Sequence, residues 1–428
     1  MLIPLGYRRD FALDRETTRR YLNTYFDRAV KARECIFLHR ASVLTDWNKG
    51  TLDGLLLKAI CALAAQLDSP RGDEHPHAVS WMEDVQNRLL ASIEKQSVTH
   101  LQTIMLVIQF NYMSGNVRVT WMLLAIAARI AFTQQFNYEQ PKRDPLMQES
   151  LRRLMWSIYL FDRSVCGGLE DLAVCPPNRL HIRLPSTDYA FHHGLTSVSP
   201  YLNQPISSGC DMRVSNYYLR LMAIRDRILG YTKRVIREGS SPFDSQDELR
   251  SLEVELRVFQ DELPEELRLI PQRLIFMAYS EELTEYLMIH GTWYQCNCDL
   301  YRFLVPGIRE SVPQSAIDAS PQFYVQDCQK KCLDNAILQC DLWSKIYNLS
   351  DHQTVNIPGI AFYLYQCINI IDNLVNLLPE EGDNCFLEVS KKLAETIAFV
   401  HRIRGTYTQG LNTWVDRPVR CKGRESKD

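Results

Sequence analysis

The sequence predicts an all-α fold, a large bundle-like body of many helices with a long irregular crossing near residues 167–210. Three observations support this prediction. Apolar residues recur with the 3.6-residue period of a helix along most of the chain. No segment shows the convincing alternation of apolar and polar residues that marks a half-buried strand. The 428 residues are 46% hydrophobic and 23% charged, which is the balance of an ordinary globular protein.

Four helices are predicted before residue 137. The first covers residues 14–32. The second, residues 52–67, is apolar around most of its circumference and should therefore lie in the centre of the fold. The third and fourth cover residues 97–113 and 117–136. Gly115-Asn116 separates these two helices and is typical of a turn.

A fifth helix precedes the irregular crossing. Its apolar stripe has the i, i+3, i+4, i+7, i+8 spacing, with Arg152 and Arg153 off the stripe. The stripe consists of Leu151, Leu154, Met155, Ile158 and Tyr159. Residues 167–210 then contain five prolines and four glycines, which interrupt the helical pattern. We expect this crossing to be partly packed, because it would otherwise expose Leu180, Ile182, Leu184, Tyr189 and Phe191.

Helices are predicted to resume after residue 210. Ser245 and Glu248 have the spacing of a capping box, directly before an apolar stripe that begins at Leu249. The other predicted helices cover residues 211–237, 272–305, 322–348, 360–378 and 386–412. No linker cleanly divides the chain. We therefore interpret residues 1–428 as a single all-helical region, in which two lobes could meet near residue 210.

Charge and hydropathy exclude several classes of protein. The net charge of −3 provides no overall field that would attract nucleic acid or an acidic membrane. The two most apolar stretches, residues 55–67 and 119–132, are interrupted by Lys58 and Arg129, so neither has the length of a membrane-spanning helix. The first residues lack the features of a secretory signal. We therefore expect the protein to stay inside the cell.

The 13 cysteines are scattered through hydrophobic segments and are predicted to be buried, structural thiols. No Cys-x-x-Cys occurs. The closest spacings are Cys296-x-Cys298 and the helix-spaced pair Cys328 and Cys332, and neither is accompanied by the second pair of ligands that a zinc site needs. The sequence therefore predicts no metal site in this chain.

Asp188, His192 and His193, with His181 upstream, form a local cluster of histidines and a carboxylate. Neighbouring histidines point apart on a regular element, and the segment is predicted to be a loop, so we disfavour a catalytic or metal site there. The motifs of serine hydrolases, zinc proteases and phosphate-binding loops are absent. The sequence therefore predicts no catalytic, cofactor-binding or metal-binding residues, and no enzyme.

Aromatic residues are frequent in the second half of the chain, for instance Trp293, Tyr294, Tyr301 and Phe303. Pockets between helices often have such a lining. Core packing explains the same residues more simply, because aromatic side chains dominate protein cores. A small-molecule effector stays open as the alternative.

Three motifs in order, within residues 17–195, give a family resemblance. The matching residues are Ala127, Arg129 and Ala131, then Glu149, Arg152, Arg153, Trp156 and Asp162, then Arg183, Leu184 and Pro185. On these residues the stretch resembles the middle homology region of fungal zinc-cluster transcription factors, and residues 211–428 are a compatible helical continuation. Three features depart from the family pattern: Ala125 stands in place of a glycine, Ser157 in place of a second tryptophan, and Gly167-Gly168 in place of a Gly-Pro.

The resemblance implies a regulatory domain that acts in transcription in the nucleus. It would work through protein contacts with the transcription machinery or other regulators, or together with a DNA-binding zinc cluster. Family members normally carry six cysteines that bind two zinc ions ahead of this region. No such cluster occurs in this sequence, so zinc is expected only if that cluster exists elsewhere. The alternative is a helical effector-sensing or scaffold protein that derives from the family and does not bind DNA.

Arg129 lies in an otherwise apolar helix, and a guanidinium is rarely buried without a partner. We expect a buried ion pair between Arg129 and an acid of the next signature helix, with Asp162 favoured over Glu149. The alternative is that the Arg129 side chain reaches solvent.

Overall fold

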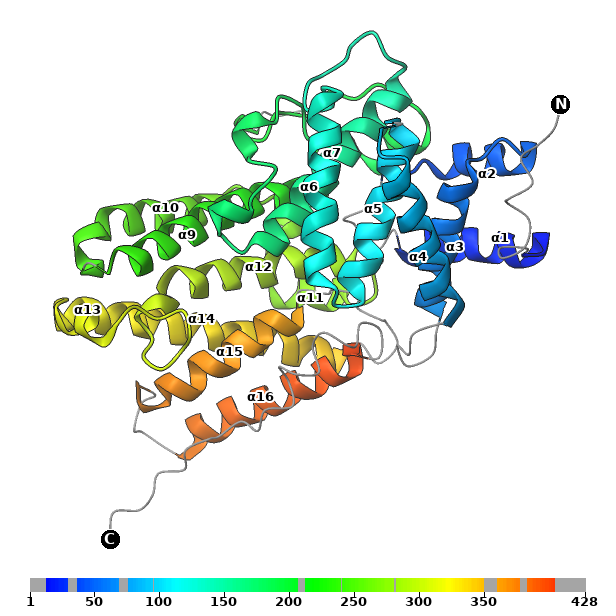
Figure 1. Ribbon diagram of the computed structural model, residues 1–428. Coiled ribbons are helices and arrows are strands. Elements are labelled where there is room, and N and C mark those ends of the chain that lie inside the picture. The colour runs from blue at the N-terminus through cyan, green and yellow to red at the C-terminus, as the bar shows by residue number, and fades with distance from the viewer. Residues whose placement is uncertain are drawn as a thin grey trace. The chain divides into compact units, whose positions relative to one another are not determined.

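The residues that the structure describes form sixteen α-helices and no strand (Figure 1). This computed structural model describes residues 13–29, 37–68, 76–94, 96–206, 212–239, 241–280, 282–349, 360–377 and 383–404. Two isolated β-bridges, Tyr138 with His181 and Arg183 with Tyr201, are the strand-like pairings found there. The all-α prediction is therefore confirmed. No described helix is long and apolar enough to span a membrane.

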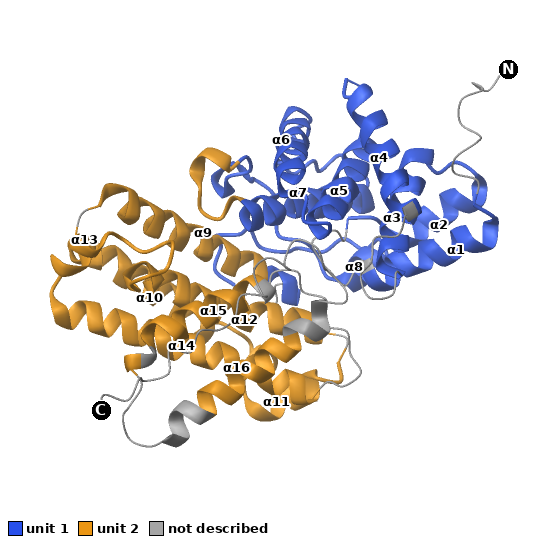
Figure 2. Cartoon of the chain, turned by 60° about the horizontal axis from the view of Figure 1, so that its bottom comes forward, with its two compact units in different colours: residues 1–165, 174–216, 405–410 blue, residues 166–173, 217–404, 411–428 orange. Residues whose placement is uncertain are grey.

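The chain divides into two compact units (Figure 2). Unit 1 comprises residues 1–165, 174–216 and 405–410, and unit 2 comprises residues 166–173, 217–404 and 411–428. The interpretation of residues 1–428 as one helical region stays a prediction.

Unit 1 contains the first eight helices. These are α1 (Arg15–Thr24), α2 (Arg40–Lys49), α3 (Gly54–Asp68), α4 (Pro76–Ala91), α5 (Val98–Met113), α6 (Val117–Thr133), α7 (Pro145–Cys166, of which Cys166 belongs to unit 2) and α8 (Asp188–His192). The first helix is shorter than the predicted range of residues 14–32, because α1 is followed by a π-helical turn over Tyr25–Ala29. Residues 30–32 lie outside the described part of the chain.

The core of unit 1 forms around α3, which packs against α1, α4 and α5. Every residue from Lys58 to Ala65 is buried, as its apolar circumference predicts. The Asp53 carboxylate accepts hydrogen bonds from the backbone N–H groups of Leu55 and Leu56, both at 2.9 Å, and so caps the start of the helix. Lys58 is buried because its ammonium pairs with Asp84 of α4 at 2.8 Å.

Unit 2 contains the remaining helices. These are α9 (Val214–Glu238, which begins at the boundary), α10 (Gln246–Asp261), α11 (Pro271–Met277), α12 (Leu283–Tyr301), α13 (Gln314–Asp318), α14 (Gln322–Leu349), α15 (Ile360–Leu374) and α16 (Asp383–Arg404). Its central element is α14, which packs against α12, α15 and α16.

Two predicted features of unit 2 are wrong. The predicted helix over residues 272–305 is broken into α11, α12 and the 3-10 turn η8 (Arg302–Leu304). Ser245 stands at the N-cap position of α10, but its side chain makes no capping hydrogen bond. Instead, its hydroxyl lies 3.2 Å from the carbonyl oxygen of Pro242 and 3.2 Å from the hydroxyl of Tyr231, because the 3-10 turn η6 (Pro242–Ser245) precedes the helix.

All nine cysteines that the structure describes are buried and free, which confirms the prediction for those nine. They are Cys61, Cys166, Cys175, Cys296, Cys298, Cys328, Cys332, Cys340 and Cys367. Burial raises the pKa of Cys61 to about 12, so this thiol stays protonated. Of the other four, Cys35, Cys210 and Cys421 lie outside the described residues, and the side chain of Cys385, in α16, is not described.

Two helical glycines of unit 2 have opposite surroundings, and their substitution by alanine should have opposite effects. A Cβ at Gly291 of α12 would lie 2.6 Å from ring carbon Cζ2 of Trp343, a buried side chain that stacks on Phe399. Gly291→Ala should therefore destabilise the protein by about 1–3 kcal/mol through overpacking. A Cβ at Gly230 of α9 meets nothing within 4 Å. Gly230→Ala should therefore stabilise it by up to about 1 kcal/mol, the difference in helix propensity.

Urea unfolding followed by circular dichroism checks this pair of variants. An unchanged or higher midpoint for Gly291→Ala would contradict the packing at Gly291, and a lower midpoint for Gly230→Ala would contradict the open surroundings of that glycine.

Candidate functional site: a buried polar network in unit 1

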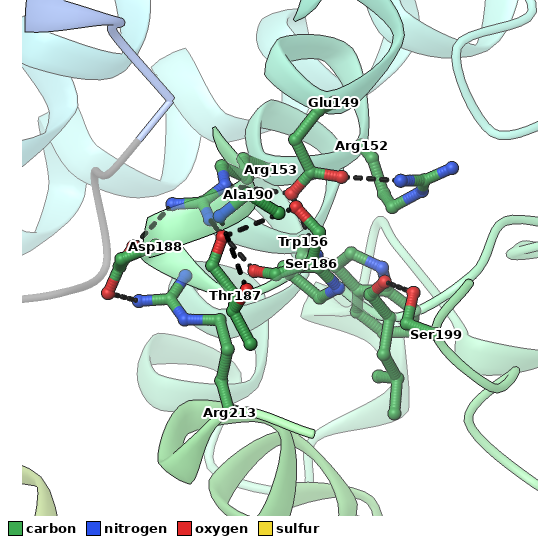
Figure 3. A network of polar contacts seen from close by, with 12 residues as sticks. Glu149, Arg152, Arg153, Trp156, Ser186, Thr187, Asp188, Ala190, Ser199 and Arg213 are labelled. Carbon is green, nitrogen blue, oxygen red and sulfur yellow. Dashed lines mark hydrogen bonds and ion pairs between the residues drawn. The ribbon is translucent and has the colours of Figure 1, made fainter. Parts of the chain in front are cut away.

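One face of α7 carries charged residues into the interior of unit 1 (Figure 3). Glu149, Arg152, Arg153 and Trp156 lie within two turns of this helix, and all four are buried. The sequence places the two arginines off the apolar stripe of this amphipathic helix. The structure buries the arginines as well, because each is compensated by carboxylates.

Glu149 is the centre of this network. Its carboxylate accepts hydrogen bonds from Nε of Arg153 at 2.8 Å and from the guanidinium of Arg152. Its Oε1 atom also accepts the backbone N–H of Ser186 at 2.8 Å. A single carboxylate thus joins two guanidiniums of its own helix to the backbone of the irregular crossing.

Arg153 extends the network to α8 and, through Asp188, to Arg213, the residue before α9. It is 3% exposed, and its guanidinium donates to Asp188 at 2.9 Å and to the carbonyl oxygens of Ser186 and Thr187 at 2.9 and 3.3 Å. The guanidinium carbon also lies 4.1 Å from the ring centre of Phe191, a cation–π contact. Asp188 accepts a further hydrogen bond from Arg213 at 2.6 Å.

Arg152 connects α7 to the loop before it. Its guanidinium makes two hydrogen bonds with Glu139, at 2.8 and 3.1 Å, and Oε1 of Glu139 accepts the backbone N–H of Arg183 at 2.8 Å. Burial alone lowers the pKa of Arg152, but hydrogen bonding to Glu139 and the charge of Glu149 raise that pKa above its ordinary value. The side chain therefore remains a cation within the core.

Residues 183–186 have few backbone hydrogen bonds of their own, and side chains satisfy much of their polar backbone. The indole N–H of Trp156 donates to the carbonyl oxygen of Arg183 at 2.7 Å. The Ser199 hydroxyl donates to the carbonyl oxygen of Leu184, and Asn216 donates to that of Pro185 at 3.0 Å. The Arg-Leu-Pro motif is therefore fixed to the Glu149 motif by direct contacts.

Asp162, the last acid of the second motif, has a separate role. It is 0% exposed and pairs with Arg163. Its carboxylate also accepts the backbone N–H groups of Val174 and Cys175, the latter at 2.8 Å. Asp162 therefore holds the chain where it returns to unit 1 after α7.

The expected burial and pairing of Arg129 is wrong. Arg129 is exposed, and no ion pair or hydrogen bond of its side chain is found with a described residue. The physical reason is the helix face: α6 buries Leu123, Ala127 and Ile130 against its neighbours and turns Arg129 away. Glu149 and Asp162 meanwhile pair with arginines of α7 itself.

The cluster of histidines disfavoured as a site does not converge in the structure. His181 stacks on Tyr138, with ring centres 4.8 Å apart, and His193 contacts Tyr189 at 4.4 Å. Burial lowers the pKa of His192. Asp188 pairs with Arg153 and Arg213 of the network. No group of three or more potential metal ligands occurs among the described residues.

The sequence motifs missed part of the network. Glu139 lies in a segment without a helical period, Arg213 and Asn216 lie at the start of a different predicted helix, and no spacing in the sequence links these residues to α7. The expected packing of the crossing holds for Ile182, Leu184 and Phe191, which are buried, whereas Tyr189 is 68% exposed.

The arrangement holds charges in place. Three carboxylates (Glu139, Glu149 and Asp188) balance three guanidiniums (Arg152, Arg153 and Arg213), and each carboxylate binds at least one guanidinium. Such a network orders the elements that contribute to it. The network therefore clamps α7, the crossing and the residues that lead into α9 together, through ion pairs and hydrogen bonds.

The family model described as "Fungal specific transcription factor domain" matches residues 22–260, a range that includes the whole network. An uncharacterized transcriptional regulatory protein of Schizosaccharomyces pombe is 21% identical over 312 residues, covering 66% of this chain and 32% of the relative. The "Activator of stress genes protein 1" of Candida albicans is 24% identical over 293 residues, covering 59% and 28%.

A Zn(2)-C6 fungal-type transcription factor of Fusarium oxysporum is 23% identical over 208 residues, covering 45% of this chain and 22% of the relative. The chain thus spans about a third or less of the length of these relatives. No solved structure matches the chain.

Proposed function

The chain belongs to the fungal specific transcription factor domain family, and on this basis we propose that it is the regulatory region of a transcription regulator. The observation that carries the proposal is the match over residues 22–260, more than half of the 428 residues. The printed names of the relatives, which are transcription factors and regulatory proteins, support the same conclusion. We place its action in the nucleus and assign it no enzymatic step.

The proposed mode of action is contact with other proteins, either the transcription machinery or other regulators. Affinity for DNA requires lysines and arginines that can reach phosphates, and base recognition requires side chains that enter a groove. Arg152 and Arg153 are instead buried and paired with carboxylates. The net charge of −3 supports the same view. DNA recognition is therefore assigned to a zinc cluster outside this sequence, and zinc is assigned only to that cluster.

The polar network would support contacts with other proteins by holding α7, the crossing and the residues that lead into α9 in one arrangement. A binding surface made of helices and a long crossing needs that crossing fixed, since ordering a flexible segment at the moment of binding reduces affinity. The contacts of Glu149 and Arg153 with Ser186 supply such order in advance.

A reporter assay tests the proposal. The chain is fused to an unrelated DNA-binding domain and directed to a promoter in a fungal cell. We expect a several-fold change in transcription relative to the DNA-binding domain alone. Unchanged transcription from a fusion that is expressed and located in the nucleus would contradict the proposal.

A gel-shift titration tests the assignment of DNA recognition. The chain alone should bind duplex DNA only weakly at physiological salt and without preference among sequences. Tight and sequence-selective binding by this chain would overturn that assignment.

A further inference from the structure

Helix α11 and the turn after it carry apolar side chains on every side. Residues 274–279 are all hydrophobic, and a helix with this pattern is normally buried around its whole circumference. The buried residues are Leu274, Met277 and Ala278. The exposed fractions of Ile275, Phe276 and Tyr279 are instead 47%, 69% and 75%. One apolar side of α11 is therefore left uncovered.

The three exposed apolar side chains lie together on one side of the helix. Tyr279 is four residues after Ile275 and three after Phe276, which are the spacings of neighbours on a helix surface. The helical path continues to Tyr279, because its N–H donates to the carbonyl oxygen of Phe276 at 3.2 Å. Gln272 is exposed and completes the i, i+3, i+4, i+7 spacing. We call these four residues the α11 face, and a contiguous exposed apolar patch of this kind is typical of an interaction surface.

Helix α12 holds the segment that leads into α11. The hydroxyl of Tyr286 donates to the carbonyl oxygen of Arg268 at 3.0 Å. Nε2 of His290 donates to the carbonyl oxygen of Leu267 at 2.8 Å. Burial lowers the pKa of His290 to about 4, so the ring stays neutral at physiological pH. The α11 face is therefore ordered before any partner arrives, which reduces the entropy lost on binding.

Acidic side chains lie on both sides of the α11 face along the chain. Residues 261–285 contain seven aspartates and glutamates against two arginines. Glu265 and Glu266 lie in the 3-10 turn η7 (Glu265–Leu267), next to the two anchored carbonyl groups, and Glu282 is the N-cap residue of α12. These three glutamates are exposed, and none forms an ion pair with a residue that the structure describes. Their charges are therefore available to a partner.

The charges decide which partner fits the apolar α11 face. A second copy of the chain would bring the acids of one copy against those of the other, and like charges across an interface oppose association. The same carboxylates would repel nucleic acid and acidic membranes. A protein segment that carries basic residues beside an apolar stripe would gain both burial and charge pairing.

We propose that the α11 face, with Glu265, Glu266 and Glu282 beside it, docks an amphipathic helix of another protein whose apolar stripe is flanked by lysines and arginines. A helix fits because the i, i+3 and i, i+4 rows of two helices interlock. Phe276 and Tyr279 are the anchors, since aromatic side chains supply much of the energy of an interface. This inference rests on the proposed function and gives its protein contact a surface.

Fluorescence anisotropy with two synthetic helical peptides tests the proposal on the full chain. Both peptides carry leucines at positions i, i+3, i+4 and i+7, and they differ in having lysines or glutamates at the flanking positions. We expect the lysine peptide to bind at least about tenfold more tightly than the glutamate peptide. The difference should shrink at about 0.5 M salt, where exposed charges are strongly screened.

Variants separate the α11 face from other exposed side chains. Phe276→Ala and Tyr279→Ala should each weaken binding of the lysine peptide at least about tenfold, as for anchor residues of an interface. Both side chains are mostly exposed, so the variants should keep the melting temperature of the unmodified protein. Phe323→Ala is the matched control, because Phe323 of α14 is 70% exposed and outside the α11 face, and its binding should be unchanged. Glu265→Gln combined with Glu282→Gln should weaken binding several-fold at low salt only.

Three outcomes would overturn the proposal. The first is the absence of binding by the lysine peptide at millimolar concentration. The second is equal affinity for the two peptides, and the third is an affinity that Phe276→Ala leaves unchanged. Sedimentation checks the second copy: a dimer of the full chain that Phe276→Ala dissociates would assign the face to self-association, which also contradicts the proposal.

The reporter assay separates this proposal from the regulatory function. The fusion that carries Phe276→Ala and Tyr279→Ala should lose most of the change in transcription that the unmodified fusion produces. If the unmodified fusion is active and the double variant equals it, the assigned surface is wrong and the regulatory function stands. If the unmodified fusion is inactive while the lysine peptide binds, the regulatory function is wrong and the surface stands.

Discussion

Glu149→Gln should lower the free energy of unfolding of unit 1 by about 3–5 kcal/mol, the usual cost of breaking a buried ion pair by removing one partner. Glutamine has nearly the same shape, so the change removes charge and little volume. It leaves three guanidiniums against two carboxylates in a network that is balanced in the unmodified protein. Glutamine can also present an N–H group to the Ser186 N–H, which now donates to Oε1 of Glu149.

Denaturant unfolding combined with hydrogen exchange measures this effect. Amide protection should fall in α7 and at Ser186, which report on the network directly. Glu248→Gln is the matched control, because its ion pair with Arg234 is substantially exposed and should be worth less than about 1 kcal/mol. Equal and small losses in the two variants would show that the network does not clamp the crossing.

Asp299→Asn should have a similar or larger effect, about 5 kcal/mol, on unit 2. The substitution leaves the buried guanidiniums of Arg225 and Arg302 without their shared carboxylate. The same denaturation experiment measures the loss, with exchange read in α12. Asp247→Asn is the matched control, because the Asp247 side chain is 94% exposed and its removal should change stability by less than about 1 kcal/mol.

A second substitution distinguishes unbalanced charge from lost packing at residue 299. Arg302→Met in the Asp299→Asn background removes one of the two stranded cations and should restore part of the lost stability. A double variant that is less stable than Asp299→Asn alone would contradict the charge argument.

The sequence predicts the long helices well and the interruptions badly. Apolar periodicity over residues 322–348 corresponds to α14 (Gln322–Leu349). Ser97, directly before α5, caps that helix, as serine commonly does at a helix start. The break between α11 and α12 and the π-helical turn after α1 both lie inside segments whose apolar residues keep a helical period, so periodicity alone does not locate them. Tertiary packing, which periodicity does not contain, determines where these helices end.

The candidate site was partly predictable for a related reason. Its α7 residues were identified through the family motif, but hydropathy places an arginine such as Arg153 on a polar face. In the sequence, a helix face that carries buried ion pairs therefore shows the same pattern as a face exposed to solvent. Arg129 shows the opposite error, since its neighbours in sequence are apolar while its own face of α6 is exposed. In unit 2, the spacing of Gln295, Asp299 and Arg302 within an apolar helical segment was a signal that could have been used.

The buried thiols provide chemical reporters on both units. Cys61 and Cys175 belong to unit 1, and the other seven described cysteines belong to unit 2. An alkylating reagent attacks the thiolate, and a buried, protonated thiol reacts only when its surroundings open. The rate at which each cysteine is alkylated therefore measures how often that part of the chain opens. Mass spectrometry of the labelled peptides would compare the opening of the two units in one sample, at cysteines that the chain already contains.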